Sequence, residues 1–174
     1  MKLQPPLSNR LILFSVTLCL LLTACHPESE QNNVTAGPTT YFPIRIGAQL
    51  AHLQLALNDA ERSKGLMFRD QLKSHHGMLF IFERPAQRHF WMRNTRIPLD
   101  LGYFDSFGKL KEIHKLYPYD ETSVASRSRQ IQIVIEMNQG WYSQQGVLTG
   151  AQIDLQALSQ AIRSRGFDPS DFQL

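Results

Sequence analysis

The chain has 174 residues, 43% of them hydrophobic, and its 18 basic and 15 acidic residues give a formal net charge of +3. Lys2 and Arg10 lie in an N-terminal segment that we expect to be removed, and without them the basic residues fall to 16 against 15 acidic ones, a net charge of +1. A charge so close to zero argues against nucleic acid, or a polybasic contact with a membrane surface, as the partner.

The first 24 residues have the layout of an export signal. Lys2 and Arg10 precede an apolar run from Leu11 to Leu22, and the small residues Thr23 and Ala24 then lead to Cys25. The run is shorter than the roughly 20 apolar residues of a membrane-spanning helix. The segment resembles a bacterial lipobox, whose cysteine is lipidated and becomes the new N-terminus. We therefore expect a signal peptide over residues 1–24 and lipidation of Cys25; the alternative is an ordinary signal peptide that happens to contain a cysteine.

The lipobox resemblance also implies a location and a partner. Bacterial lipoproteins carry a diacylglyceryl thioether and an amide-linked chain such as palmitate, and two or more chains anchor a protein stably where one does not. His26, rather than aspartate, follows Cys25, which by this resemblance implies the outer membrane, facing the periplasm, in a cell with two membranes. Cys19 leaves with the signal, so the exported domain has no free thiol and no disulfide.

The remaining chain is predicted to be a flexible tether followed by short strands. Residues 25–40 are rich in Pro, Ser, Thr, Asn and Gln, the composition of a linker. Leu53, Leu55 and Leu57 alternate with less apolar residues, which is the period of a strand. Asp59 is expected to cap a helix over residues 60–64, and this helix is expected to end at Gly65. Further strands are predicted over residues 78–82, 89–92, 99–104, 109–117, 131–136 and 147–155, helical turns over 138–145 and a helix over 157–165.

These elements predict one mainly β domain. Many short strands with small helical inserts favour a β-sandwich or a compact barrel. We place this domain at residues 41–155 and expect residues 156–174 to form a C-terminal helical tail.

Four ordered blocks carry a family resemblance. They are Gly65-Leu66-Met67-Phe68-Arg69, Gly77-Met78-Leu79-Phe80, Phe90-Trp91-Met92-Arg93-Asn94-Thr95 and Ile97-Pro98-Leu99-Asp100. Together with Glu136, Gly140-Trp141 and Gly146, they resemble the bacterial and archaeal family called domain of unknown function 192, over about residues 53–155. The resemblance implies a small, mostly β fold of the sandwich type, often exported, and no established reaction. The chain departs from the family pattern at residues 124–129.

Several polar residues stand among apolar ones. Arg69 follows three apolar residues, Asp100 lies between Leu99 and Leu101, and Glu136 lies between Ile135 and Met137. Since a buried charge needs a partner, the simplest expectation is that Arg69 pairs with Asp100 or Glu136 and has a structural role.

A functional alternative uses the same residues as a shallow pocket. Trp91 would be an apolar platform, while Arg69, Asn94, Asp100 and Glu136 would contact a polar ligand. This combination suits a sugar, so the sequence favours a binding or accessory module for an envelope polysaccharide or envelope protein over an enzyme. A glycan hydrolase needs two carboxylates that flank the scissile bond, and Asp100 with Glu136 is the one pair that the sequence offers.

The sequence gives little indication of a metal or cofactor. Met67, Met78 and Met92 could bind Cu(I) in a copper carrier, but they have no shared spacing and are expected to fill gaps in the core. The histidines lack the paired spacing of a zinc site, and no nucleophile motif is present. We therefore expect no cofactor and no metal.

Overall fold

The computed structural model describes residues 35–174. The expected signal peptide, Cys25 and most of the expected tether therefore lie outside the described residues. Within residues 35–174 no helix has both the length and the apolar character needed to cross a membrane.

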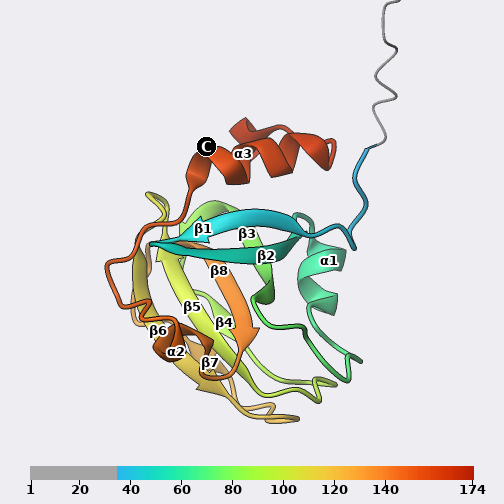
Figure 1. Ribbon diagram of the computed structural model, residues 1–174, viewed down its shortest axis with the longest axis vertical. Coiled ribbons are helices and arrows are strands. Elements are labelled where there is room, and N and C mark those ends of the chain that lie inside the picture. Colours follow the sequence, from blue (N-terminus) through green and yellow to red (C-terminus); the bar gives the residue numbers. More distant parts are fainter. Residues whose placement is uncertain (1–34) are drawn as a thin grey trace, which may run out of the picture. The chain divides into compact units, whose positions relative to one another are not determined.

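Six strands form one mixed sheet, in the order β1-β2-β3-β8-β5-β6 (Figure 1). All neighbours are antiparallel except β2 and β3, which are parallel because the helix α1 connects them. Within residues 35–174 the edge strands β1 and β6 are not paired with each other, so the sheet is open. The six strands are β1 (Phe42–Ile46), β2 (Gln49–Ala56), β3 (His76–Ala86), β5 (Leu99–Asp105), β6 (Leu110–Leu116) and β8 (Ile131–Asn138).

A second, two-stranded sheet pairs β4 (His89–Phe90) with β7 (Val124–Ala125). The helical elements are short: α1 (Asp59–Lys64), α2 (Trp141–Gln144), α3 (Leu155–Ser164) and the 3₁₀ helix Pro169–Phe172. The expectation of a mainly β fold with small helical inserts is confirmed, in the form of an open mixed sheet and not a closed barrel.

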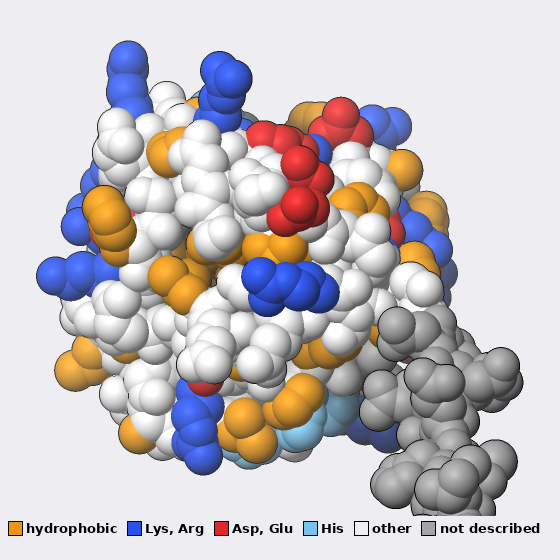
Figure 2. Space-filling model, turned by 90° about the horizontal axis from the view of Figure 1, so that it is seen from above, with side chains coloured by type: hydrophobic (Ala, Val, Ile, Leu, Met, Phe, Trp, Pro, Cys, Tyr) orange, Lys and Arg blue, Asp and Glu red, His pale blue; other side chains and the backbone are white. Residues whose placement is uncertain are grey.

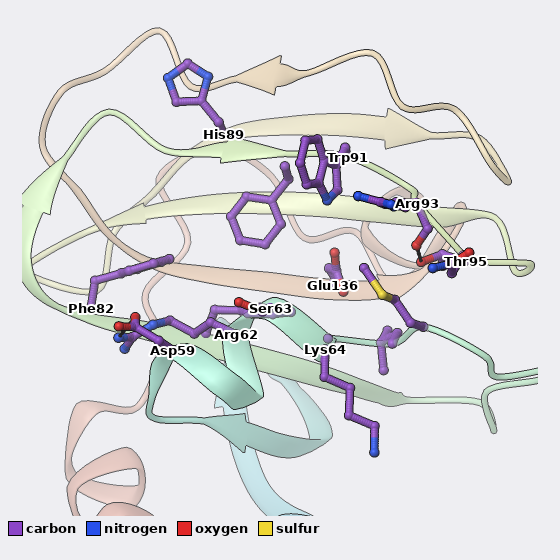
Figure 3. A pocket seen from close by; sticks show the side chains of 16 residues that line it. Asp59, Arg62, Ser63, Lys64, Phe82, His89, Trp91, Arg93, Thr95 and Glu136 are labelled. Atoms are coloured by element: carbon purple, nitrogen blue, oxygen red, sulfur yellow. Dashed lines mark hydrogen bonds and ion pairs between the residues drawn. The ribbon is translucent and has the colours of Figure 1, made fainter.

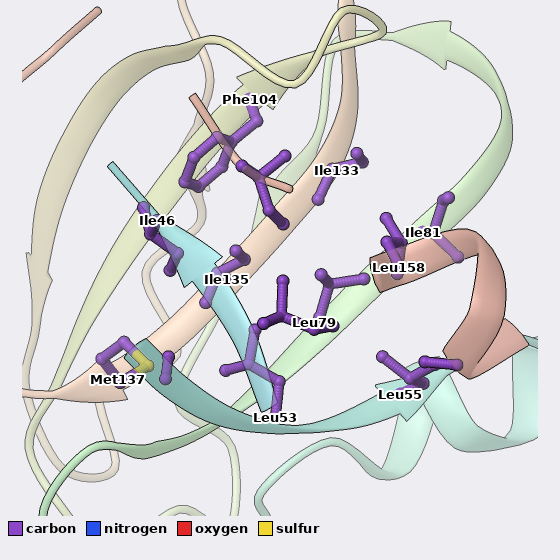
Figure 4. Close-up of a cluster of buried hydrophobic side chains, with 14 of the residues drawn as sticks. Ile46, Leu53, Leu55, Leu79, Ile81, Phe104, Ile133, Ile135, Met137 and Leu158 are labelled. Atoms are coloured by element: carbon purple, nitrogen blue, oxygen red, sulfur yellow. The ribbon is translucent and has the colours of Figure 1, made fainter. Parts of the chain in front are cut away.

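Both faces of the large sheet are covered. Because side chains alternate along a strand, Leu79 and Ile81 of β3 belong to one hydrophobic cluster and Met78 and Phe80 to the other. We call the first the α3 cluster, because α3 buries Leu158, Ala161 and Ile162 in it (Figure 4). We call the second the cavity-side cluster; it includes Phe80, Met92, Leu101, Tyr103 and Val134.

The segment after residue 155 packs on the sheet. Asp154 caps α3 by accepting the Ala157 N–H, and the helix lies over β1 (Figure 1). Figure 2 views the molecule from this side, and hydrophobic atoms appear there only in small separate areas among polar ones. This face is therefore already covered by the chain's own helix.

Some predicted elements differ from those observed. Asn58, not Asp59, caps α1, and the strand predicted over residues 89–92 ends at Phe90. The strand predicted over residues 147–155 is wrong: this segment is a loop with isolated bridges, because Gly146 and Gly150 adopt positive φ values and turn the chain. Its backbone instead bonds to the turns that follow β1 and β5.

The close packing of β3 against β8 at Gly77 leads to a prediction about the stability of the sheet. A Cβ atom there would lie 2.3 Å from the Glu136 carbonyl oxygen and 2.4 Å from the Met137 Sδ. Because the backbone of β8 cannot move aside cheaply, Gly77→Ala is expected to lower the free energy of unfolding by about 1–3 kcal/mol or more. Urea melts measure this. Gly37→Ala, where a Cβ meets nothing within 4 Å, is the control, and equal stability of the two variants would contradict the packing.

Candidate functional site

A cavity of about 620 Å³ opens over the cavity-side face of the sheet, within the size range of small-molecule sites. Its floor comes from β3 and β8, one wall from α1 and residues 65–67, and the opposite wall from β4 and the loop after it (Figure 3). The lining includes the aromatic side chains Phe80, Phe82, Phe90 and Trp91 and the polar side chains Arg62, Lys64, Arg93, Asn94, Thr95 and Glu136.

The α1 wall is fixed by a dense polar network. Asn58 accepts the Glu61 N–H at 2.9 Å, and the Glu61 carboxylate in return accepts the N–H of Leu57, the residue before the N-cap, at 2.8 Å, in a variant of the capping box. Arg62 donates to the Ile81 carbonyl at 2.8 Å and pairs with Asp59 and Glu83 at 2.7 and 3.0 Å. The Arg62 charge is therefore neutralised by its own neighbours, which leaves it a structural role.

The opposite wall is a loop held by two buried residues. Met92 and Thr95 are 1% and 5% exposed, and their backbone N–H groups donate to the carbonyls of Asp120 and Met92. The intervening and preceding residues therefore stay at the surface: Trp91 is 52% exposed, and Arg93 and Asn94 are also exposed. This explains the pattern of the Trp91–Thr95 block. Met92 and Thr95 are buried anchors, and the other three side chains remain at the cavity.

Three loops meet beside this wall in unusual backbone conformations. Phe68, Asn94 and Tyr119 have φ values of 64°, 53° and 61°, in the left-handed region. The Phe68 N–H donates to the Asn94 carbonyl at 2.9 Å, and the Tyr119 N–H donates to the Thr95 carbonyl at 3.1 Å. For bulky residues such as Phe and Tyr this region is strained, and such strain is often found at functional sites.

Glu136 forms the polar part of the cavity floor (Figure 3). It is 4% exposed and lies in the middle of β8, and the strand register sets Met78 of β3 and Leu101 of β5 on either side of it. Burial among these apolar neighbours raises the pKa of its carboxyl to about 8, although Arg69 acts in the opposite direction. Within residues 35–174 no hydrogen bond or ion pair to this carboxyl is formed, and its raised pKa favours the protonated form at neutral pH.

Arg69 does not pair with either predicted carboxylate. Its guanidinium donates to the Gln54 Oε1 at 2.5 Å and to the Tyr41 hydroxyl at 3.1 Å. Gln54 in turn donates to the Thr39 carbonyl at 2.9 Å. Arg69 thus ties the segment before β1 to the sheet, and it acts on Glu136 only through its charge. The expected ion pair is wrong because neutral oxygens from β2 and Tyr41 satisfy the guanidinium.

Asp100 lies on the other face of the sheet. It is paired with Met137 in the β5–β8 register, whereas Glu136 is paired with Leu101. Since side chains alternate, Asp100 points away from the cavity, and its Oδ2 accepts the Gly140 N–H at 2.8 Å before α2. Burial raises the pKa of Asp100, and the bonds from Gly140 and Tyr142 oppose this rise. Asp100 and Glu136 are thus separated by the sheet and do not flank a common site.

The predicted site residues are therefore only partly brought together. Trp91, Asn94 and Glu136 line one cavity, Arg69 lies on the same face of the sheet but outside the lining, and Asp100 points to the other face. Sequence reasoning missed Arg93, although it belongs to the same block as Trp91 and Asn94. Met78 and Met92 are buried in the cavity-side cluster while Met67 lines the cavity. In the part of the chain that the structure describes, no group of three His, Cys, Asp or Glu side chains is arranged to hold a metal ion.

The blocks that build this cavity also identify the family. The model of the family DUF192, described as "Uncharacterized ACR", matches residues 43–155, which is more than half of the chain. The chain belongs to this family. No curated protein matches the chain.

Two solved structures share the fold of this DUF192 protein. One is a protein of unknown function from Novosphingobium aromaticivorans, with 30% identity and a TM-score of 0.63, covering 70% of this chain and 95% of its own. The other is described as a putative transcription regulator from Sinorhizobium meliloti, with 32% identity and a TM-score of 0.63, covering 68% of this chain and 97% of its own.

The raised pKa of Glu136 predicts how stability depends on pH. Below the unfolded pKa of 4.5 the carboxyl is protonated in both states, and between 4.5 and about 8 it ionises only in the unfolded chain. This group therefore lowers the free energy of unfolding as pH rises, by roughly 3–5 kcal/mol over that window, and adds no further change above it.

Glu136→Gln removes this ionisation and keeps the shape of the side chain. Urea melts at pH 5 and pH 8 should show the variant gaining stability over the wild type as pH rises. An identical pH dependence in the two proteins would contradict a buried, unpaired carboxyl at this position.

Proposed function

We propose that this domain binds a polar small molecule, with a saccharide as the ligand class that fits best. The observation that carries the proposal is the buried Glu136 carboxyl, which faces the cavity and has no partner within residues 35–174. The carboxyl oxygens are accessible from the cavity, since they are not among the enclosed side-chain atoms of residues 35–174 that lack a hydrogen-bond partner. A ligand in the cavity can therefore form a hydrogen bond with Glu136 at the floor of the site.

The remaining lining suits a sugar. Trp91 and Phe90 give flat apolar surfaces for the C–H face of a pyranose ring, and Asn94 offers both a donor and an acceptor for its hydroxyl groups. The Asn94 amide and the Trp91 indole N–H make no hydrogen bond to any residue from 35 to 174. These groups are therefore free for a ligand in the same way as Glu136.

The proposed location narrows the source of the ligand. We infer from the lipobox-like sequence that the mature chain starts at a lipidated Cys25 and is held in the cell envelope, in the outer membrane if the cell has two membranes. The part of the expected tether 25–40 that precedes Ala36 then lets the domain reach envelope polysaccharide or envelope protein, since Ala36 bonds to Ser164 and Thr39 to Gln54. Nucleic acid, which the description of the Sinorhizobium meliloti relative suggests for that protein, is disfavoured by a net charge near +1.

Binding is favoured over the two alternative functions. A glycan hydrolase needs a second carboxylate near Glu136, and the other one that lines the cavity, Asp59, is already paired with Arg62 at 2.7 Å. A copper carrier needs clustered thioethers, whereas Met78 and Met92 pack in a hydrophobic cluster. The lone protonated Glu136 still gives a specific reason to test for acid catalysis in a hydrolase screen.

The binding proposal predicts the effect of removing the platform. In a glycan array, the soluble domain from residue 35 onward should bind a defined set of glycans, and Trp91→Ala should weaken that binding by tenfold or more through the loss of stacking area, about 1.4 kcal/mol or more. Because Trp91 is 52% exposed, its removal should leave the urea midpoint almost unchanged. Phe107→Ala, which removes an aromatic side chain that is 77% exposed and does not line the cavity, is the matched control. Equal binding by all three proteins, or by none, would refute the proposal.

The anchoring proposal is tested separately. Cys25→Ser should move the protein from the membrane fraction to a soluble fraction, because a serine cannot form the thioether. Mass spectrometry of the wild type should show the mass of the attached acyl chains, and the variant should lack it. A variant that stays in the membrane fraction with unchanged mass would show that Cys25 is not the anchor.

A further inference from the structure

We propose that the ligand of this cavity is acidic: a saccharide with one anionic substituent, held by the Arg93 guanidinium on the wall and by the Glu136 carboxyl on the floor. This inference rests on the proposed function and narrows it from any polar ligand to an anionic one. Nothing in a neutral sugar requires either a free guanidinium or a protonated acid at the same cavity.

The charges around the cavity are unbalanced in favour of cations. Arg62 is neutralised by Asp59 and Glu83. By contrast, the guanidinium of Arg93 and the amine of Lys64 form no ion pair with any residue from 35 to 174, and both residues line the cavity. Burial raises the pKa of Glu136, the remaining acidic group of the lining, and favours its neutral form; these two cations outnumber it in either form. The cavity therefore carries a net positive charge, which attracts an anion.

Arg93 is the better placed of the two free cations. Figure 3 shows Arg93 beside Trp91 on the wall above Glu136, whereas the amine of Lys64 extends away from Glu136. A guanidinium binds carboxylate or phosphate oxygens in a bidentate manner, which fixes the orientation of the ligand as well as its charge. An acidic sugar whose ring stacks on Trp91 can place its anionic group at Arg93.

The neutral form of Glu136 contributes to recognition of the anionic group of the ligand. An ionised carboxylate on the floor would repel an anionic ligand, while a protonated one donates a hydrogen bond to it. Its charge is influenced by Arg69, which bonds to Gln54 on the same face of the sheet, by the hydroxyls of Tyr103 and Tyr142, and by the groups across the cavity. Those groups are Asp59 with Arg62, Lys64, His89 and Arg93. Anion binding and protonation of Glu136 therefore favour each other.

The experiment compares pairs of ligands that differ in one anionic group. Calorimetry with galacturonate and its neutral methyl ester, and with glucose 6-phosphate and glucose, separates a carboxylate from a phosphate as the anionic group. At least one acidic member should bind roughly tenfold or more tightly than its neutral counterpart. That preference should be lost in Arg93→Gln, and raised salt should weaken it.

Two variants serve as controls for charge. Lys64→Gln removes a cation at the edge of the same cavity, and Arg163→Gln removes one from α3 on the opposite face of the sheet. Arg163→Gln should leave the acidic preference unchanged, and Lys64→Gln should lower it less than Arg93→Gln does. Between pH 7 and 9.5, above the titration range of histidine, the affinity of the wild type for the acidic ligand should fall, and Glu136→Gln should abolish this fall because an amide cannot ionise.

The outcomes distinguish this inference from the proposed function. Equal binding of acidic and neutral members overturns the acidic ligand and leaves saccharide binding intact. A preference for acidic members that survives Arg93→Gln overturns the assigned contact. Binding of neither member of any pair, together with an empty glycan array, overturns both proposals.

Discussion

The placement of a carboxyl group on the apolar side of a central strand is the constraint on which the site depends. β8 lies between β3 and β5, so both of its edges are paired, and a hydrophobic cluster lies on each of its faces. Glu136 has apolar neighbours on either side, and burial keeps it protonated at neutral pH. If side chains filled the space above it, the carboxyl would be shut in without a hydrogen bond. The cavity leaves the carboxyl accessible to a polar partner, and the surrounding elements keep the cavity open.

Two different kinds of interaction hold the walls of the cavity apart. α1 is fixed by polar contacts, in which Arg62 joins the helix to β3 and Glu61 joins it to the buried Arg165 at 2.5 Å. The opposite loop is fixed by burial of Met92 and Thr95. Because the anchors of this loop point into the core, Trp91, Arg93 and Asn94 remain at the cavity. Rigid supports of this kind reduce the entropy that a ligand must overcome on binding.

The sequence predicted the positions of the strands better than their pairing and register. Alternation along Leu99-Asp100-Leu101 and Ile135-Glu136-Met137 indicates that each acidic residue faces away from its two neighbours. It does not indicate which strands pair or in which register, and the β5–β8 register is what separates Asp100 from Glu136. A carboxylate partner is predicted for Arg69 because a buried charge needs a counter-charge, whereas the neutral oxygens of Tyr41 and Gln54, which carry no such signal in the sequence, bond to its guanidinium. The loop at residues 147–154 was mistaken for a strand because its apolar residues contact the core without joining a ladder.

The energetics of Glu136 favour a chemical role over a structural one. Holding its carboxyl protonated at neutral pH costs a few kcal/mol, a large share of the 5–15 kcal/mol by which a domain of this kind is stable. A leucine, as at the neighbouring position 101, would pack there without that cost. Arg69 contrasts with it, because its hydrogen bonds to Gln54 and Tyr41 hold parts of the fold together. Of the two residues, Arg69 therefore has the properties of a structural contact, and Glu136 those of a group available to the ligand that we propose.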